Sequence, residues 1–352
     1  MTTLSLAGQF SIPALGRFPP VMGLPFGGIS GLTTRDEGRT IFGISDARFG
    51  GRIYGFTLED VGGSLRVRTV SGTSLSMAPE DSRPDTEGIA LLPDGTFAVS
   101  AEGTGPVESG DPRLPPSIGI YGRHGNFVRR LEIPEKFIPE RTGSATRGAR
   151  GNSGFESLTL SPDGARLFTA VETALIQDGD APTFEAGSRT RILEFEARGN
   201  TYERSREFAY DIDPVQRPPY ATRTAINGLV ELLAVNRTTL LALERGYVEH
   251  RADPAQHGSR IRLFRVSLAG ATDVSALESL KGRTDVIPAT KTLLVDLSEV
   301  QGLSRELAPG LDNFEGMTFG PRLPDGRASL LLVSDDNFNQ DQRTWFLLFA
   351  IQ

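Results

Sequence analysis

Apolar and polar positions along the chain repeat one pattern, in which a short apolar strand, a tight turn and a second apolar strand follow one another. The pattern is clearest over residues 314–337, where FEGMTFG and SLLLVSDDN flank the turn PDGR. It recurs over residues 86–103 and 155–172, and in looser form over residues 26–48 and 226–246. A supersecondary unit that occurs five times indicates a repeat architecture, because each unit needs its neighbours to bury its apolar face.

The segments that follow each hairpin also alternate apolar and polar residues, so a complete unit is expected to have four strands. The strands expected in units one and two are residues 29–33, 40–45, 52–58, 64–70, 87–92, 96–101, 117–121 and 127–133. Those expected in units three, four and five are residues 156–161, 166–171, 191–196, 201–210, 228–234, 239–243, 260–268, 291–297, 315–319, 328–333 and 344–351. Residues 135–152 are expected to be a loop, and residues 269–290 an insertion with a helical turn.

Unit five lacks a fourth strand, and residues 4–12 form a spare strand at the start of the chain. Pairing of the two would close a ring of sheets and leave no sheet edge open, as in β-propellers. We therefore predict an all-β, five-bladed β-propeller that is a single domain over residues 1–352. A sixth blade within residues 71–84 or 269–300 stays open as an alternative, although neither segment contains the inner-strand pattern.

Acidic residues recur at fixed places in these units. In an antiparallel pair, the start of the first strand and the end of the second lie on the same side. The strand starts carry Glu87, Glu156 and Glu315, with Asn227 at the fourth equivalent position. The strand ends carry Asp46, Glu102, Glu172, Glu244 and the pair Asp335 and Asp336. These side chains are expected to converge at one mouth of the central tunnel.

Carboxylates that converge in one concave surface repel one another unless a cation neutralises them. A hard divalent cation such as Ca²⁺ suits such a site because it prefers oxygen ligands, and Mg²⁺ or another divalent cation is the alternative. The predicted metal ligands are Glu87, Glu156, Glu315, Asn227 and Asp336. Arginines close to these positions in the sequence offer a second way to neutralise the acids: Arg48, Arg150, Arg223 and Arg245. A third interpretation is that each Glu has only a structural role, paired with a backbone amide or an Arg.

Two further patterns bear on chemistry. Asp335, Asn337, Asn339 and Asp341 alternate as oxygen ligands do in short calcium loops. A polar turn between strands explains the same residues, and the Gly and Glu of an EF-hand are absent.

His250 and His257 lie in one predicted loop, where either could act as a general acid or base. The sequence contains no nucleophile elbow, no P-loop and no His-Glu-x-x-His motif.

Charge and composition exclude several classes of protein. The chain has 37 Lys and Arg against 44 Asp and Glu, so its net charge of −7 gives no support for a nucleic-acid partner. The absence of Cys excludes disulfides, thiolate nucleophiles and Cys-bound zinc. No apolar run reaches the length of a transmembrane span, and no signal peptide opens the chain. We expect a cytoplasmic protein, or a periplasmic or secreted one whose leader has been removed.

Several of these motifs resemble those of one protein family. DTEG at residues 85–88, NSGFE at 152–156 with SPDG at 161–164, and DNFEGMTF at 312–319 with LPDGR and LLLVSDDNFN are similar to motifs of the phytase-like family, also called esterase-like activity of phytase. The resemblance covers the chain from about Gly27 to its end. It implies a β-propeller that hydrolyses phosphate or carboxylic esters, usually in bacteria and often exported. It also implies a functional role for the acidic positions Glu87, Glu102, Glu156, Glu172, Glu315, Asp335 and Asp336. The Asp-Ala-Asp-Asp-Pro-Ala signature of calcium-dependent propeller phytases is absent, which argues against inositol hexakisphosphate as the substrate.

Two functions fit these residues. In the first, a metal-dependent ester hydrolase of the phosphoesterase type uses Glu102, Glu172 or Asp335 as the general base. Arg150, Arg245 and His250 would then bind a small anionic or ester substrate. In the second, a non-catalytic propeller binds a ligand or a partner protein, and calcium is structural. A metal position open to a pocket would distinguish the first from the second, and in either case we expect a monomer.

Overall fold

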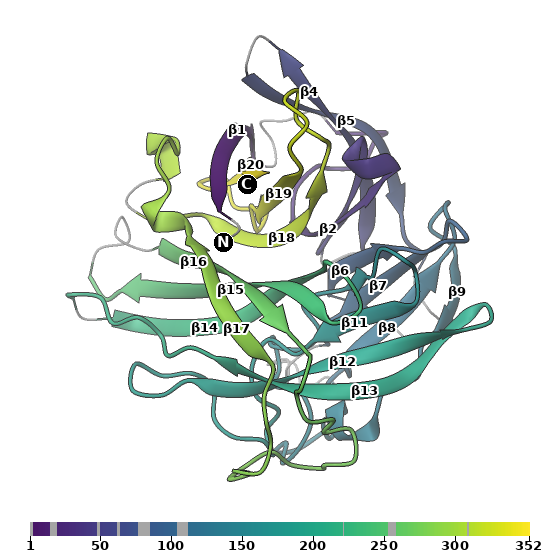
Figure 1. Cartoon of the computed structure of the whole chain (residues 1–352), viewed down its shortest axis with the longest axis vertical. Helices are drawn as coiled ribbons and strands as arrows, with labels where there is room; N and C mark the ends of the chain where they lie inside the picture. Colours follow the sequence, from purple (N-terminus) through teal and green to yellow (C-terminus); the bar gives the residue numbers. More distant parts are fainter. Residues whose placement is uncertain are drawn as a thin grey trace.

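The structure is a computed structural model that describes residues 3–14, 20–47, 50–61, 64–76, 85–103, 112–220, 222–252, 258–307 and 310–352, with the backbone alone at Asp60, Val61 and Arg223. Within these residues, twenty strands form five antiparallel sheets of four strands each. The sheets stand in a ring as the blades of a propeller (Figure 1). The predicted five-bladed β-propeller is therefore confirmed, and the described residues contain no sixth blade.

Blades 1 to 4 take their strands in sequence order from the centre outward. Blade 1 consists of β2 (Ile29–Arg35), β3 (Thr40–Ser45), β4 (Arg52–Val61) and β5 (Ser64–Ser74). Blade 2 consists of β6 (Thr86–Leu91), β7 (Phe97–Ala101), β8 (Ser117–Tyr121) and β9 (Phe127–Arg130). Blade 3 consists of β10 (Thr159–Leu160), β11 (Arg166–Ala170), β12 (Ser188–Arg198) and β13 (Thr201–Ile212). Blade 4 consists of β14 (Thr222–Ala234), β15 (Thr239–His250), β16 (Gly258–Ser267) and β17 (Thr290–Asp296).

Blade 5 joins the two ends of the chain. It consists of β18 (Asn313–Gly320), β19 (Ser329–Asp335), β20 (Arg343–Ile351) and, as its outer strand, β1 (Leu4–Pro13). The purple β1 lies beside the yellow C-terminal blade in Figure 1, and Leu4 pairs with Ile351 in an antiparallel register. The predicted closure of the ring by the N-terminal strand is thus confirmed.

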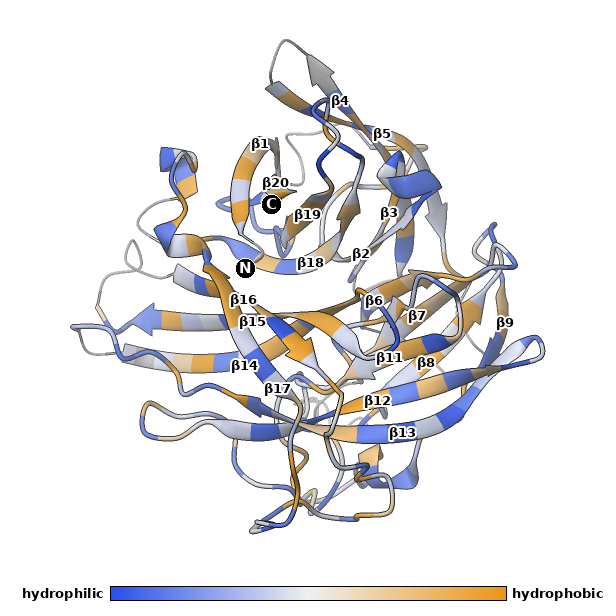
Figure 2. Ribbon diagram, in the orientation of Figure 1, coloured by the Kyte–Doolittle hydropathy of each residue, from blue (hydrophilic) through white to orange (hydrophobic). Residues whose placement is uncertain are grey.

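The apolar core is divided among the junctions between blades. Five clusters of buried side chains each combine residues from two neighbouring blades. Phe42 and Phe97 meet at the junction of blades 1 and 2 with ring centroids 5.1 Å apart, and Phe56 and Phe346 at the junction of blades 5 and 1 with centroids 5.5 Å apart. The outer strand β5 alternates exposed and buried residues, because successive side chains point to opposite faces of a blade, whereas β19 is buried along its whole length. Figure 2 shows apolar residues in orange and polar residues in blue along the blades.

Several expected boundaries are wrong. β15 does not end at residue 243 but continues to His250, paired with β14, so His250 lies at a strand end and not in a loop. The apolar run of β15 ends at Leu243, where charged residues begin. The strand continues past this point because backbone pairing does not require apolar side chains. In blade 3, β10 contains only Thr159 and Leu160, and Glu156 precedes it.

The connections contain short 3-10 turns and no longer helix within the described residues. These turns are η1 (Asp36–Gly38), η2 (Glu135–Phe137), η4 (Leu297–Glu299) and η5 (Arg305–Leu307). Residues 269–290 contain no helical turn; instead Val274, Leu280 and Val286 bury against Ala209 of β13. In the described part of the chain, no helix has the length and apolar character needed to cross a membrane.

Candidate functional site

A β-bulge recurs where the inner strand of a blade begins to pair with its neighbour. The register shifts between Ile29 and Gly31 in blade 1, and the corresponding shifts occur in blades 2, 4 and 5. In blade 3 an isolated bridge from Phe155 to Val171 precedes β10. The residues at this bulge position are Ser30, Glu87, Glu156, Val230 and Glu315. A bulge changes the direction of the side chain of the extra residue. In three of the five blades, this residue is a Glu.

A second set of residues follows the paired part of each second strand. In blades 1 to 3 their backbone N–H groups donate to the segment before the inner strand: Asp46 to Gly28 O at 2.9 Å, Glu102 to Asp85 O at 3.0 Å, and Glu172 to Gly154 O at 3.0 Å. The equivalent residues in blades 4 and 5 are Arg245, paired with Gly228, and Asp335, paired with Asn313. Blades 1, 2, 3 and 5 therefore place an acid at this position, and blade 4 places an arginine.

These side chains form one group at the centre, where the inner strands of neighbouring blades contact one another. We call Asp46, Asp85, Glu87, Glu102, Glu156, Glu172, Glu315 and Asp335 the acidic ring. Charge repulsion links its members across blades, for example Asp46 with Glu315 and Glu156 with Glu87. The structure thus brings together seven of the nine acids that were expected to converge, all except Glu244 and Asp336.

Burial and mutual repulsion raise the pKa of most of these carboxyl groups. Burial, followed by repulsion from Glu315 and Asp85, raises the pKa of Asp46 from 3.8 to about 8. Burial likewise raises the pKa of Glu102 from 4.5 to about 8, and it raises the pKa of Glu315 to about 7 although Arg245 opposes the change. The pKa values of Glu87, Glu156 and Asp335 lie well above their usual range, again mainly because of burial. The ring therefore retains protons at neutral pH unless a cation takes their place.

Glu102 and Glu156 meet across the junction of blades 2 and 3. Their carboxyl groups are hydrogen-bonded to each other. Two carboxyl groups can form this bond only when one carries a proton and donates it. Burial raises the pKa of both groups, so the pair shares a proton near neutral pH.

Arg245 neutralises the side of the ring that faces blades 3 and 5. Its Nη1 donates to Oδ1 of Asn313 and Oε2 of Glu315, and its Nη2 donates to Oε1 of Glu172 at 3.4 Å. Burial by itself lowers the pKa of Arg245, but Glu315 and Glu172 more than offset it, and the pKa lies above its ordinary value.

Asp46, Glu87 and Glu102, on the side of the ring formed by blades 1 and 2, make no ion pair with a Lys or Arg of the described residues. Asp85, Glu87 and Glu102 each place an oxygen within 4.8 Å of the others. Oδ1 of Asp46 is buried and accepts no hydrogen bond in the described part of the chain. Carboxylate oxygens are the donors that Ca²⁺ and Mg²⁺ prefer, so this set of residues fits a hard divalent cation.

The fourth blade has a different register from the one that the sequence suggested. Val230, not Asn227, occupies the bulge position, and Arg245, not Glu244, occupies the position of the second set. Asn227 donates from Nδ2 to Asp213 O at 2.9 Å and to Oε2 of Glu244 at 3.1 Å. Glu244 is buried and also accepts hydrogen bonds from Tyr210, Arg262 and Lys291. The predicted equivalence of Asn227 with Glu87 is therefore wrong.

The loop after β19 uses its acidic and amide oxygens to hold its own backbone. Oδ1 of Asp336 accepts hydrogen bonds from Gly28 N at 2.8 Å and Phe338 N at 3.0 Å, and its Oδ2 accepts one from Thr344 Oγ1 at 3.1 Å. Oδ1 of Asp335 accepts one from Asn337 N at 2.8 Å. The alternating residues considered above for calcium thus have a structural explanation as a polar turn.

The contacts described for the other two predicted substrate-binding residues, Arg150 and His250, are not with the acidic ring. Arg150 donates from Nε to Ala174 O at 3.2 Å and from Nη2 to Gly179 O, so it anchors the segment after β11. The imidazole of His250 packs against the aromatic side chain of Tyr220 with centroids 4.5 Å apart, and its Nδ1 accepts a hydrogen bond from Ala252 N. Arg48, His257 and the side chain of Arg223 lie outside the described residues.

Sequence reasoning missed two polar residues, Asp85 in the acidic ring and Asn313 beside it. Both stand two residues before the bulged Glu of their blade. The motifs DTEG and DNFEG contain this spacing. When the three units are aligned on this Glu, the position two residues before it is Asp85 in blade 2, Asn313 in blade 5 and Gly154 in blade 3. Such an alignment would have shown that this position is polar in two of the three units.

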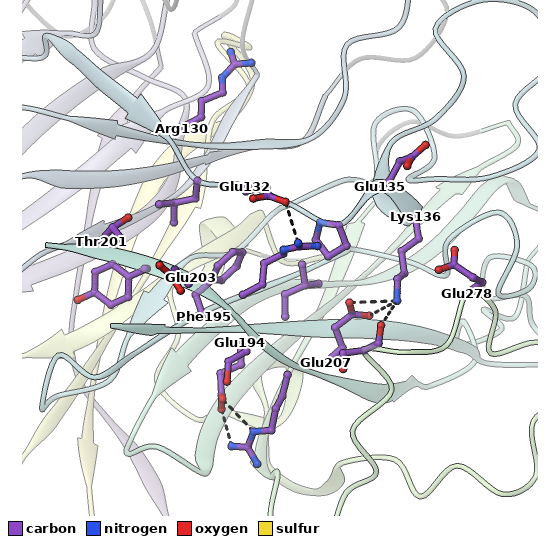
Figure 3. Close-up of a pocket in the computed structure, with 18 of the residues that line it drawn as sticks. Arg130, Glu132, Glu135, Lys136, Glu194, Phe195, Thr201, Glu203, Glu207 and Glu278 are labelled. Atoms are coloured by element: carbon purple, nitrogen blue, oxygen red, sulfur yellow. Dashed lines mark hydrogen bonds and ion pairs between the residues drawn. The ribbon is translucent and has the colours of Figure 1, made fainter. Parts of the chain in front are cut away.

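A cavity of about 750 Å³ lies away from the ring, along the outer strand of blade 3 (Figure 3). Its charged side chains largely satisfy one another: Arg204 pairs with Glu132 at 2.9 Å, and Lys136 with Glu207 at 3.4 Å. These ion pairs leave little unmatched charge for a ligand, so the acidic ring is the stronger candidate site.

The fold and the site define a β-propeller with a buried ring of carboxyl groups at its centre. The sequence profile of the phytase-like family, described as esterase-like activity of phytase, matches residues 24–338. The chain belongs to this family, as its motifs predicted.

Other comparisons are more distant. The chain is 27% identical over 242 residues to an uncharacterised secreted protein of Arthroderma benhamiae, and the match covers 60% of this chain but only 44% of that protein. Among solved structures, an endo-arabinase from Bacteroides thetaiotaomicron is 11% identical with a TM-score of 0.44, and the match covers 95% of this chain and 96% of that one. An α-L-arabinanase from Cellvibrio cellulosa is 9% identical with a TM-score of 0.40 and covers 91% of each chain. Such low scores carry no conclusion about activity.

Proposed function

We propose that the protein is a metal-dependent ester hydrolase of the phosphoesterase type, with its active site at the acidic ring. The observation that carries the proposal is the group of buried carboxyl groups of Asp46, Glu87 and Glu102, which have raised pKa values and make no ion pair with a described Lys or Arg. Membership of the phytase-like family supports ester hydrolysis.

Asp46, Asp85, Glu87 and Glu102 would hold the divalent cation, for which Ca²⁺ is the first candidate. When bound, the cation would neutralise these carboxylates and the charge of the substrate and polarise an ester oxygen. Glu156, whose pKa burial raises well above its ordinary value, would give a proton to the leaving group. Arg245 provides the positive charge that orients an anionic or polar ester group from the opposite side.

A second candidate function is a non-catalytic binding propeller with a structural cation. The hydrogen bonds from Arg245 to Glu315 and Glu172 favour it, because they already occupy part of the ring. A structural cation would have all its ligands supplied by the protein and would leave no position for an ester.

The test combines stability with activity. Chelator-treated wild type and Glu102→Gln are titrated with Ca²⁺, Mg²⁺ and Mn²⁺ during thermal unfolding, and the same samples are assayed on 4-nitrophenyl phosphate and 4-nitrophenyl acetate. A cation that binds only the folded state raises stability by about 2.7 kcal/mol at a hundredfold excess over its Kd. We expect Ca²⁺ to stabilise the wild type and to support hydrolysis, and Glu102→Gln to lose both effects.

Glu132→Gln is the matched control, because Glu132 pairs with Arg204 on the exposed surface and should leave both readouts unchanged. Stabilisation by a cation without hydrolysis of either ester would favour the binding propeller. No stabilisation by any of the three cations would contradict metal dependence.

A further inference from the structure

A cleft of about 630 Å³ opens beside the acidic ring, between blades 4 and 5. Arg245 and Asn313 line its inner end and are hydrogen-bonded to each other. Tyr247 of β15 lines one wall, and Asn337 and Asn339 from the loop after β19 line the other. Arg245 also donates a hydrogen bond to Glu315, so it lies between the cleft and the ring.

The lining offers hydrogen-bonding groups that the protein itself leaves unused. Asn337 Oδ1, Asn339 Nδ2 and the carboxylate of Asp341 make no hydrogen bond within the described residues, and all three residues are exposed. Amide groups offer both donors and acceptors, and a carboxylate offers acceptors. Tyr247 adds an aromatic face. Adjacent hydroxyl groups, each both donor and acceptor, match such a lining.

The charge of the cleft argues against a polyanionic ligand. Among the described residues, Arg245 is the only basic side chain in the lining, and it is already paired with Glu315. Glu306, Asp312 and Asp341 add carboxyl groups to the same walls. A neutral, hydroxyl-rich ligand avoids the repulsion that several phosphate or carboxylate groups would meet there.

The loop that carries the amide groups is held in a strained conformation. Asn337 and Phe338 have φ values of 46° and 50°, in the left-handed region that non-glycine residues rarely adopt. Hydrogen bonds to Asp335 and Asp336 fix both residues, and Phe338 packs so closely on Gly28 that a Cβ there would lie 2.4 Å from its ring. Strain of this kind persists only where the surroundings enforce it, and it often marks a functional site.

We propose that this cleft binds the hydroxyl-rich part of the substrate, a sugar or another polyol, while the ester group lies at the acidic ring. The proposal rests on the hydrolase function proposed above for its account of the ester. Binding of the polyol itself depends only on the cleft.

The experiment therefore measures binding directly. Methyl glucoside and sorbitol are titrated into the full chain by calorimetry and ligand-observed NMR, with cyclohexanol as a probe of similar size that has one hydroxyl group. The variants are Asn339→Ala with Asp341→Ala, Tyr247→Leu, and the control Asn200→Ala, an exposed residue in the β12–β13 turn. Thermal unfolding of each variant verifies that it folds.

We expect at least one polyol to bind and cyclohexanol not to bind. Loss of the two hydrogen-bonding side chains should weaken polyol binding at least tenfold. Tyr247→Leu should also weaken binding, and Asn200→Ala should not. If the protein hydrolyses esters, the double variant should raise KM for an acetylated or phosphorylated sugar at least tenfold with little change in kcat.

Failure of both polyols to bind, or binding that the double variant leaves unchanged, would overturn this proposal. An active esterase that does not bind polyols would contradict the cleft proposal alone. A protein that binds polyols in the cleft but hydrolyses no ester would contradict the hydrolase proposal alone.

Discussion

Arg245 occupies in blade 4 the position that carries a carboxyl group in the other four blades. One guanidinium cannot balance the whole ring, and its contacts reach Glu172 and Glu315 but not Asp46 or Asp85. Within the described residues, the ring is therefore neutralised on the side of Glu172 and Glu315, whereas Asp46, Glu87 and Glu102 make no ion pair with a Lys or Arg. Under the proposed function, this asymmetry would separate the place of the cation from the place of the ester group.

The raised pKa values predict how stability depends on pH without a metal. The folded protein binds protons at Asp46 and Glu102 up to about pH 8, whereas in the unfolded chain these groups titrate near 3.8 and 4.5. Between these values the folded state binds more protons than the unfolded state, so the free energy of unfolding falls as pH rises. Thermal unfolding of chelator-treated protein from pH 4.5 to pH 8 should show this decline.

Added Ca²⁺ should restore stability near pH 8 and have little effect near pH 4.5, because it competes with protons for the same oxygens. Glu102→Gln is the matched variant and should show a shallower decline with pH. A stability that stays level or increases over this range in chelator would show that the ring does not hold protons as described.

At the scale of elements, the bulge position carries a Glu of the acidic ring in three blades and lies where neighbouring blades approach each other. Gly88 follows the bulged Glu87 on β6, and a Cβ at Gly88 would lie 2.4 Å from the backbone nitrogen of Leu158 in blade 3. Gly31 of β2 approaches the carbonyl oxygen of Glu87 in the same way. The inner strands can approach this closely only because these positions lack a side chain.

Gly88→Ala should therefore destabilise the protein by about 1–3 kcal/mol, the usual range for overpacking a closely packed site. Urea unfolding measures the change. Gly246→Ala is the control, because a Cβ there would meet its nearest atoms at 3.6 Å and should change stability by about 0.5 kcal/mol or less. Equal effects of the two substitutions would contradict the close approach of β6 to blade 3.

At the scale of the whole molecule, β1 joins the two ends of the chain into one blade. Ser5 stands directly opposite Ala350 in the β1–β20 pair. Residues opposite each other in antiparallel strands lie within the Cα separation that a disulfide spans. The chain has no Cys of its own, so an engineered pair would have no competing partner.

The variant Ser5→Cys with Ala350→Cys should form an intramolecular disulfide on oxidation. It should raise stability by up to about 4 kcal/mol, because it closes a loop of almost the whole chain in the unfolded state. Non-reducing electrophoresis and thermal unfolding, with and without reductant, measure both effects. Each single Cys variant is a control, and disulfide-linked dimers in place of a cross-linked monomer would contradict closure of the ring by β1.

Much of the architecture followed from the sequence. The repeated hairpins predicted five blades, the missing strand of unit five predicted the role of residues 4–12, and the recurrence of Glu87, Glu156 and Glu315 predicted a shared position. These features are local, since they depend on alternation within a strand and on the residues of one turn. They could therefore be recognised without knowing which strands are neighbours.

The tertiary structure alone decided which acids belong to the ring. Side chains alternate faces along a strand, so a difference of one residue reverses the direction of a side chain, and a bulge adds such a residue without a clear sequence signal. For this reason the sequence could not show that Arg245, not Glu244, completes the ring, or that Asp85 joins it. The cleft between Tyr247 and Asn339 likewise depends on the packing of blade 4 against blade 5, so no local pattern in the sequence could reveal it.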